Sequence, residues 1–255
     1  MIQQFNTDTD ALISRARINE SKAKHDLEEW IIRLLPPLRG LQVLDLGSGT
    51  GKQVFRLAPL VSDEGLILGI DLSQDAVRAV NQRAESEKTQ WVKAQQMSLD
   101  DCLHRLAGKH FDLIISSYAI YYAQDPVALL KGLRSILTDR GVVFVCGPGD
   151  GTNREIYDTV NSFIHDASAQ LKPVDDFLGP TQIREIGNMY SQFTISRLKN
   201  QILFDSANGV ISWWKHHNSF ISSVSDSVEN NIRTHFETNN IFSLSKNVLG
   251  VRFNV

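Results

Sequence analysis

The 255-residue sequence predicts an α/β fold whose core is a doubly wound, mostly parallel sheet of seven strands. Two observations predict it. Residues 41–147 alternate short apolar runs with amphipathic helical patterns, which is the order that builds a parallel sheet. A glycine-rich stretch, 47–51, follows the first apolar run and precedes a helical pattern, as at the ligand-binding edge of such a sheet.

Five strands are predicted in this first half, at 42–46, 65–71, 90–95, 111–117 and 141–147. Helical patterns between them begin near Lys52, Ser73, Leu99 and Asp125. Ser73 is a preferred N-cap residue, and Asp125 stands before Pro126, which suits the first position of a helix. The apolar runs are therefore separated by well-marked helix starts.

The remaining elements are predicted from weaker patterns. An N-terminal helix over 8–35 ends before two prolines, because proline cannot continue a helix. Helices are expected over 154–170 and 181–190, a sixth strand over 193–204 and a seventh over 244–255. The last two strands are separated by about forty residues of insertion.

Composition indicates one globular α/β protein. Hydrophobic residues make up 42% and charged residues 22%, and the net charge of −3 offers no general attraction to nucleic acid. No window approaches the roughly 18 apolar residues of a membrane span, and the two cysteines, Cys102 and Cys146, have no nearby partner at metal spacing. We therefore expect a cytoplasmic protein that binds neither nucleic acid nor membrane; its oligomeric state is open.

Three interpretations of the glycine-rich loop are separated by spacing. A phosphate-binding loop needs a glycine at 46 and a hydroxyl residue at 53, where the chain has Leu46 and Gln53. A dinucleotide fingerprint needs its third glycine at Lys52. What remains is an acidic residue, Asp45, two positions before three alternating glycines, and in this the sequence resembles the class I S-adenosylmethionine-dependent methyltransferases of the small-molecule type.

The resemblance implies a Rossmann-like sheet with S-adenosylmethionine as cofactor, and it divides the chain into parts. Residues 1–40 form an N-terminal helical lid, and residues 41–255 form the methyltransferase domain. Helical segments that cap the substrate are expected at about 151–190 and 205–240. The methyl acceptor is expected to be a small molecule.

The same resemblance assigns the methionine and ribose contacts. The loop wraps the methionine part of the cofactor, and Asp45 lies near its amino group. Asp71, twenty positions after the last loop glycine, binds the ribose hydroxyls; alternatively, it only caps the helix that starts at Ser73. The loop residues of this set are Gly47, Ser48, Gly49 and Gly51.

The resemblance assigns further cofactor contacts, at the adenine and at the methionine amino group, to residues on later strands. Leu72 is expected to pack on the adenine, and Gln95 and Gln96, followed by Met97, stand where the family usually has an Asp-Ala type pair. Ser117 closes the fourth strand, and there it is expected to place an oxygen near the methionine amino group.

Three residues are candidates for the methyl-transfer step. Tyr121 falls where the methyl donor faces the substrate, and either His216 or His217 is able to accept a proton. Alternatively, Val210, Trp213, Trp214 and His217 share a helical spacing and form a packed face. No metal is expected, because adjacent histidines on a helix diverge by about 100°.

The sequence therefore predicts methyl transfer to an oxygen or nitrogen of a small organic metabolite by in-line displacement, which requires alignment and exclusion of water more than covalent catalysis. Two alternatives are open. The chain is a non-catalytic binding or scaffold protein with this fold, or it is an NAD-dependent oxidoreductase.

Overall fold

The computed structural model describes residues 22–217 and 219–255 and divides into two compact units. The sheet unit comprises Leu27–Gly147, Asp176–Arg197 and Leu249–Val255. The small unit comprises Pro148–Asp175, Leu198–Val248 and, from the N-terminal stretch, the described residues 22–26. Each unit has its own core, so each is described by itself.

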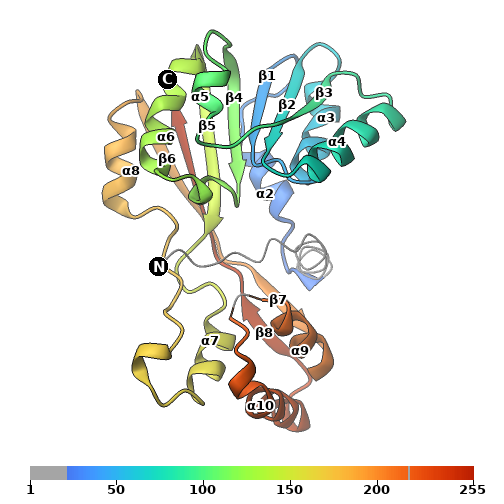
Figure 1. The fold of residues 1–255 in the computed structure, drawn as a ribbon, viewed down its shortest axis with the longest axis vertical. Helices are drawn as coiled ribbons and strands as arrows, with labels where there is room; N and C mark the ends of the chain where they lie inside the picture. The colour runs from blue at the N-terminus through green and yellow to red at the C-terminus, as the bar shows by residue number, and fades with distance from the viewer. Residues whose placement is uncertain (1–21, 218) are drawn as a thin grey trace. The chain divides into compact units, whose positions relative to one another are not determined.

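Seven strands form the large sheet in the order β3-β2-β1-β4-β5-β9-β6 (Figure 1). Strands β1 to β5 pair in parallel, which brings their carboxyl ends to one edge. The predicted doubly wound, mostly parallel sheet is confirmed. Its strands are β1 Gln42–Leu46, β2 Leu66–Asp71, β3 Val92–Gln96, β4 Phe111–Ser117, β5 Leu137–Pro148, β6 Gln192–Leu198 and β9 Val248–Asn254.

Helices cover both faces of this sheet. On one face, α5 (Cys102–Arg105), α6 (Pro126–Gly132) and α8 (Pro180–Gly187) bury apolar side chains in one cluster with Leu44, Leu46, Val143 and Val145. On the other face lie α2 (Leu27–Leu34), α3 (Lys52–Val61) and α4 (Gln74–Ser86). There Trp30 of α2 meets Phe144 edge to face, with ring centroids 6.4 Å apart.

The predicted sixth strand, 193–204, is wrong as one strand. β6 ends at Leu198, and β7 (Gln201–Phe204) belongs to a separate two-stranded sheet. The chain breaks at Asn200, whose buried carboxamide replaces sheet hydrogen bonds: its Oδ1 accepts the amides of Gln201 and His25, at 2.9 and 3.0 Å. The apolar pattern does not reveal this break, because it depends on a partner 175 residues away.

The predicted seventh strand, 244–255, divides in the same way. β8 (Phe242–Ser245) pairs antiparallel with β7, and β9 begins at Val248 in the large sheet. The break at Lys246 and Asn247 lies beside the first one, since the Lys246 amide donates to the Asn200 carbonyl at 2.8 Å. Each predicted strand therefore serves both sheets.

Three predicted helices are shorter than the sequence suggested. The part of the 8–35 helix that the structure describes is interrupted at 23–26, where Ala23 bridges to Ile202; residues 1–21 lie outside the described residues. The 154–170 helix ends at Asn161 (α7, Arg154–Asn161), whose carboxamide pairs with the backbone of Leu171. The helix expected near 99 begins at Cys102.

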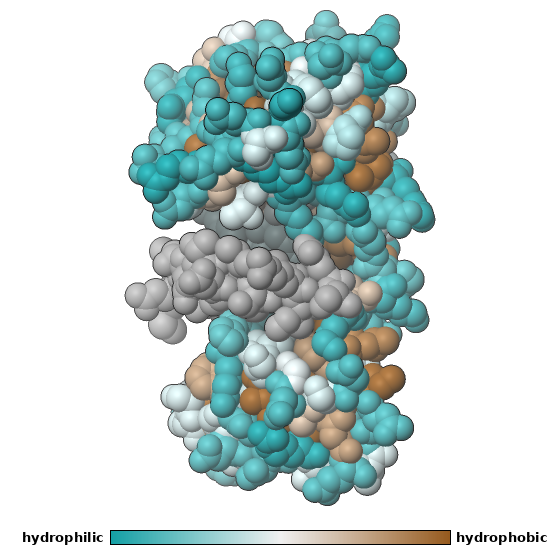
Figure 2. All heavy atoms as spheres, turned by 90° about the vertical axis from the view of Figure 1, so that its right-hand side faces the viewer, coloured by the Kyte–Doolittle hydropathy of each residue, from teal (hydrophilic) through white to brown (hydrophobic). Residues whose placement is uncertain are grey.

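The small unit surrounds its own apolar cluster, built from α7, β7, β8, α9 (Ala207–Lys215) and α10 (Ser225–Thr238). Trp213 and Trp214 of α9 are buried in it. In the described part of the chain, no helix is long and apolar enough to cross a membrane. The face shown in Figure 2 is mostly hydrophilic, with its hydrophobic side chains in separate small groups.

Candidate cofactor site

The glycine loop between β1 and α3 requires glycine at each alternating position. Gly47, Gly49 and Gly51 have φ angles of +74°, +52° and +85°, a region that other residues rarely adopt. A Cβ on Gly47 would overlap the Cβ of Ala119, and one on Gly51 would lie 2.9 Å from Phe55 and Val80. A Cβ on Gly49 meets nothing within 4 Å, so this glycine faces open space, where a ligand fits.

Asp71 holds this loop from the end of β2. Its Oδ2 accepts the amide of Gly49 at 2.8 Å, and its Oδ1 accepts the amide of Ser73 at 2.9 Å. The N-cap of α4 is Ser73, whose hydroxyl accepts the amide of Ala76 at 3.2 Å. Asp71 is thus not itself the N-cap, but it supports both the start of α4 and the loop, and its contact with the ribose stays a prediction.

Asp45 and Ser48 present buried polar atoms without partners among the described residues, namely Asp45 Oδ2 and Ser48 Oγ. Burial, and secondarily the charge of Asp71, raise the pKa of the Asp45 carboxyl to about 7. Gly69 in β2 makes room for Ser48, since a Cβ there would lie 2.7 Å from Ser48 Oγ. Such unsatisfied groups call for an additional partner, such as a bound ligand or ordered water.

The residues predicted to contact the adenine lie at the ends of β2 and β3. The Leu72 side chain is 71% exposed, which leaves an apolar surface beside Asp71. Gln96 donates from Nε2 to the Leu72 carbonyl at 3.0 Å, and the Met97 amide donates to the Asp71 carbonyl at 2.9 Å. Gln95 is exposed beside them. The structure thus groups these four predicted residues at the ends of adjacent strands.

Ser117 and Tyr118 occupy the end of β4. Ser117 Oγ accepts a weak hydrogen bond from the thiol of Cys146, with 3.6 Å between Oγ and Sγ. Tyr118 has a φ of +58°, which is strained for an aromatic residue, and its amide donates to the Cys146 carbonyl at 2.8 Å. Sequence reasoning missed Tyr118, because a positive φ outside glycine leaves no signal in the sequence.

Tyr121 lies on the next turn, with its ring centroid 4.7 Å from that of Tyr122 and 6.0 Å from that of Phe177. Burial, and then the neighbouring Tyr122, raise the pKa of the Tyr121 phenol well above its ordinary value. Tyr121 therefore stays protonated at neutral pH. It is suited to donate a hydrogen bond rather than to act as a base.

Glu28 of α2 was also missed by sequence reasoning. It is buried, and its carboxylate forms an ion pair with Lys52, the residue directly after the loop. Lys52 is the position where a dinucleotide fingerprint needs glycine, and here its side chain carries this pair instead. The glycine pattern alone contains no signal for the acidic partner 24 positions earlier.

The predicted histidines lie in the small unit. Val210, Trp213 and Trp214 are buried, which confirms the packed face, but α9 ends at Lys215, before both histidines. His216 is exposed. His217 is partly buried and stacks on Trp213 with ring centroids 4.5 Å apart; its Nδ1 accepts the amide of Ser219 at 3.1 Å.

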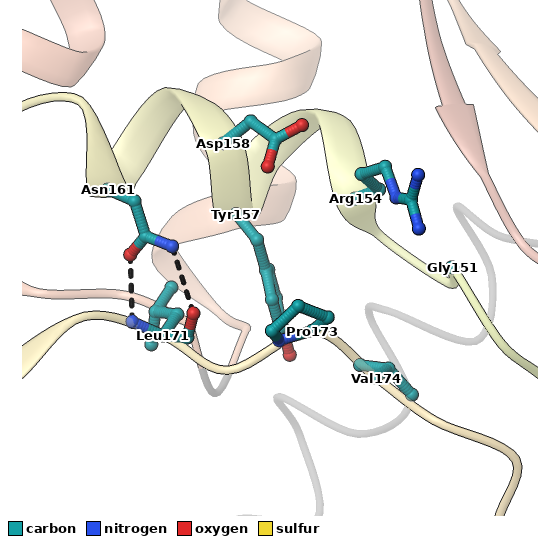
Figure 3. Close-up of a pocket in the computed structure, with 8 residues that line it drawn as sticks. All are labelled: Gly151, Arg154, Tyr157, Asp158, Asn161, Leu171, Pro173 and Val174. Carbon is teal, nitrogen blue, oxygen red and sulfur yellow. Dashed lines mark hydrogen bonds between the residues drawn. The ribbon is translucent and has the colours of Figure 1, made fainter.

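A pocket of about 190 Å³ also lies within the small unit (Figure 3). Asn161 fixes one end of its wall through two hydrogen bonds to the Leu171 backbone, at 2.7 and 2.9 Å. The Gly151 amide fixes the other end by donating to the Val174 carbonyl at 2.9 Å. Tyr157 points from α7 toward Pro173 between these two anchors (Figure 3).

The sheet-unit residues fit S-adenosylmethionine. The open space beside Gly49, the unpartnered oxygen of Asp45 and the exposed Leu72 offer, in sheet order, places for the methionine, its ammonium group and the adenine. Asp71 keeps acceptor capacity after its two backbone bonds, because each carboxylate oxygen has two lone pairs. These features suit an elongated cationic ligand.

Comparisons with known proteins point the same way. A family described as "Methyltransferase domain" matches residues 38–197. The chain is 30% identical over 112 residues to arsenite methyltransferase of Aquipseudomonas alcaligenes, covering 42% of this chain and 32% of that protein. It is 27% identical over 202 residues to trans-aconitate 2-methyltransferase of Deinococcus radiodurans, covering 71% and 70%.

Among solved structures, the YcgJ protein of Bacillus subtilis has a TM-score of 0.59 at 15% identity, over 89% of this chain and 97% of that one. At this identity the likeness shows the fold alone. The chain spans about a third of the arsenite methyltransferase, and about half of three further methyltransferase relatives.

Alanine substitutions should separate the two kinds of loop glycine. Gly47→Ala overlaps Ala119 and should lower the free energy of unfolding by about 1–3 kcal/mol. Gly49→Ala costs only the left-handed backbone, about 1 kcal/mol, but places a methyl group in the ligand space. Thermal unfolding and calorimetric titration with S-adenosylmethionine measure both; equal affinity in Gly49→Ala and wild type would contradict this assignment.

Cofactor affinity should depend on pH through Asp45. The cofactor's positive groups favour the ionised carboxylate, whose pKa is about 7 in the free protein, so affinity should fall by at most about tenfold per pH unit below 7. Without cofactor the sign reverses. The pKa of Asp45 is higher in the folded chain than in the unfolded chain, so its contribution to the free energy of unfolding is fully present below about pH 4 and is lost as pH rises toward 7. In Asp45→Asn both dependences should flatten, and a persisting affinity slope would implicate another group.

Proposed function

The chain belongs to the S-adenosylmethionine-dependent methyltransferases, and from this premise we propose that it methylates an oxygen or nitrogen of a small organic metabolite. When bound, the cofactor supplies an electrophilic methyl group on a sulfonium. The chain's own residues then have to bind and orient the two reactants and exclude water.

The observation that carries this proposal is the small unit. It is built from segments that follow β5 and that lie between β6 and β9, and it contributes none of the loop, Asp45 or Asp71. Its pocket of about 190 Å³ and its ordered polar groups are places for an acceptor. A cavity of about 150 Å³ accepts benzene, so the pocket is of a size for a small organic group.

A polar cluster in this unit supports an acceptor with a transferable proton or a negative charge. Asn153 has a φ of +60° and accepts from Lys246 Nζ at 3.0 Å, and its Nδ2 lies 3.3 Å from His217 Nε2. Lys246 also lies over the ring of Trp213, 5.2 Å from its centroid. These contacts hold an imidazole and an ammonium group in fixed positions, which suits proton acceptance and anion binding.

Two relatives bear on the class of acceptor. The match to trans-aconitate 2-methyltransferase of Deinococcus radiodurans extends over 71% of this chain. Arsenite methyltransferase matches only 42%. The broader match favours an organic acceptor. Domain roles follow the same proposal: the parts of the predicted cap segments that lie in the small unit, 151–175 and 205–240, recognise the acceptor, while the strands of the sheet unit bind the donor. Residues 176–190, expected as part of the first cap segment, pack in the sheet unit instead.

The proposal is tested with the purified full chain and radiolabelled S-adenosylmethionine against a panel of small carboxylic acids, including trans-aconitate, together with amines and hydroxylated aromatic compounds. Transfer to an oxygen or nitrogen is expected, identified by mass spectrometry of the product. Transfer only to carbon or arsenic would contradict the proposed acceptor atom. Failure of the chain to bind S-adenosylmethionine in calorimetry would contradict methyl transfer from this cofactor altogether.

His217 and His216 provide a matched pair for the proton-transfer role. If His217 accepts a proton from the acceptor, His217→Gln should lower kcat by about 10²–10⁴-fold with unchanged cofactor affinity. The exposed neighbour variant, His216→Gln, should keep wild-type kcat. A carboxylate acceptor needs no base, so an unchanged kcat in both variants with a non-ionised acceptor would remove His217 from the reaction.

Asp71 and Ser73 separate ribose binding from helix capping. Asp71→Ala should weaken S-adenosylmethionine binding by about 1–3 kcal/mol, because the ribose hydroxyls lose a charged acceptor. Ser73→Ala removes the α4 cap and should lower the free energy of unfolding by about 1 kcal/mol without changing affinity. Calorimetry and thermal unfolding measure both variants, and an Asp71→Ala chain that binds S-adenosylmethionine as tightly as the wild type would contradict the ribose contact.

A further inference from the structure

Arg154 is a cation that the proposed function leaves unused. It is the first residue of α7 and lines the pocket of the small unit, where its guanidinium lies on the Gly151 side (Figure 3). Among the residues that the structure describes, this guanidinium has no hydrogen bond or ion pair. Arginine stays charged in proteins and carries several N–H donors, so this side chain is able to bind an anion at the pocket.

The space beside Gly151 is bordered by nitrogen donors. The three heavy atoms nearest to a Cβ built on this glycine are Asn247 Nδ2 at 3.5 Å, Arg154 Nη2 at 3.8 Å and Arg154 Nε at 3.9 Å. Asn247 Nδ2 donates one N–H to the Asp150 carbonyl at 2.7 Å and has a second one. Donors from two distant segments therefore border one small space, which the glycine leaves open for acceptor oxygens.

The two arginine atoms at this space form the edge that suits a carboxylate. Nε and Nη2 present parallel N–H groups, which match the two oxygens of a carboxylate. Arg39 uses the same two atoms elsewhere in this chain, where they bind Glu64 through both carboxylate oxygens. Arg154 has the same edge beside Gly151, without an acid on it among the described residues.

The backbone holds these donors in place. The Gly149 amide and the Thr152 hydroxyl both donate to the Asn247 carbonyl, at 2.9 and 2.6 Å. Gly151 has a φ of +74°, and its amide donates to the Val174 carbonyl of the pocket wall. The loop before α7 is thus tied both to Asn247 and to the wall. Such a site needs little ordering when a ligand binds, which favours affinity.

The charges around the site favour an anion with a single charge. Asp150 directly precedes Gly151, and Asp158 lines the pocket one helical turn after Arg154. Both acids are exposed. Each of them repels the second charge of a phosphate dianion, and only one guanidinium is present in the pocket lining to offset it. A carboxylate fits this balance better than a phosphate.

The rest of the lining suits a compact carbon skeleton. Leu171, Pro173 and Val174 form an apolar side of the pocket, and Tyr157 points toward Pro173 (Figure 3). The pocket volume of about 190 Å³ is larger than the cavity of about 150 Å³ that holds benzene. A carboxylate at Arg154 would therefore carry a small aliphatic or aromatic group along this side.

We propose that Arg154 and the Asn247 carboxamide bind a carboxylate of the methyl acceptor, so that the acceptor is a compact organic acid. The carboxylate is held by the Nε–Nη2 edge of Arg154 beside Gly151, and the carbon part lies along Leu171 and Pro173. Arg154 thereby selects acids over uncharged compounds. This inference rests on the proposed function, because it takes the bound acid to be the acceptor.

Binding is tested with the full chain, without cofactor, by calorimetric titration with millimolar benzoate and with its uncharged analogue benzamide. Benzoate should bind at least about tenfold more tightly, because the amide cannot form the charged pair with arginine. Arg154→Gln should abolish this preference. The control Arg233→Gln, which removes a guanidinium from α10 in the same unit, should keep it. No binding of benzoate, equal affinities in the wild type, or a preference that survives in Arg154→Gln would overturn the inference.

A pair of glycine variants tests the position of the carboxylate. Gly151→Ala places a methyl group between the donors, while Gly108→Ala has a similar backbone cost, since its φ is +80° and nothing lies within 4 Å of its Cβ. Thermal unfolding should show similar losses of stability in both variants. Only Gly151→Ala should weaken benzoate binding, by about tenfold. Unchanged benzoate affinity in Gly151→Ala would overturn the site beside this glycine.

Methyl transfer separates this inference from the proposed function. With the carboxylic acids of the panel, Arg154→Gln should raise KM by about tenfold and change kcat and S-adenosylmethionine affinity by less than about twofold. Transfer by the wild type only to uncharged compounds, or an unchanged KM in Arg154→Gln, would overturn the inference and leave the proposed function intact. A wild-type chain that binds benzoate but not S-adenosylmethionine would overturn the proposed function instead.

Discussion

The Asp71 carboxylate holds two backbone amides from two different elements, Gly49 of the loop and Ser73 at the start of α4. The bond to Gly49 ties the loop after β1 to the end of β2, next to the amides of Gly47 and Ser48, which donate to the Ile70 carbonyl. With the loop drawn toward β2, Gly47 reaches Ala119 on the other side and Gly49 faces open space. The alternating glycines follow from this constraint, because a side chain at 47 or 51 meets a neighbour.

Three carboxylates determine the electrostatics of the cofactor edge. Asp45 is buried with an oxygen that has no partner among the described residues, Asp71 is bound to amides, and Glu28 is paired with Lys52. In the free protein the site resists a full negative charge, as the raised pKa of Asp45 shows. A positively charged ligand offsets both the burial of the Asp45 carboxylate and its repulsion by Asp71. Binding of such a ligand and ionisation of Asp45 therefore favour one another. This coupling explains how an acidic edge is kept in the fold.

The small unit is structurally separate from the sheet that carries the loop. Its segments are additions to the strands, and its core of aromatic and aliphatic side chains is separate from the core of the sheet. In the proposed function these additions recognise the acceptor while the sheet unit binds the donor, and the relatives are named for acceptors as different as arsenite and trans-aconitate. A fold shared by such different relatives does not identify an acceptor, so the proposal for this chain depends on side chains such as His217 and Lys246.

By itself, the sequence determined the parallel strands β1 to β5, the loop and the identity of the donor, because these depend on local periodicity and on glycine spacing within about thirty residues. Tertiary structure decided the breaks at Asn200 and Lys246, the strained backbone of Tyr118 and the burial of Glu28. Each of these depends on a partner that is distant in the chain or on packing that no local pattern records. An apolar run predicts a strand equally well whether it stays in one sheet or passes into a second, and the distinction depends on distant contacts such as the bonds of the Asn200 side chain and carbonyl.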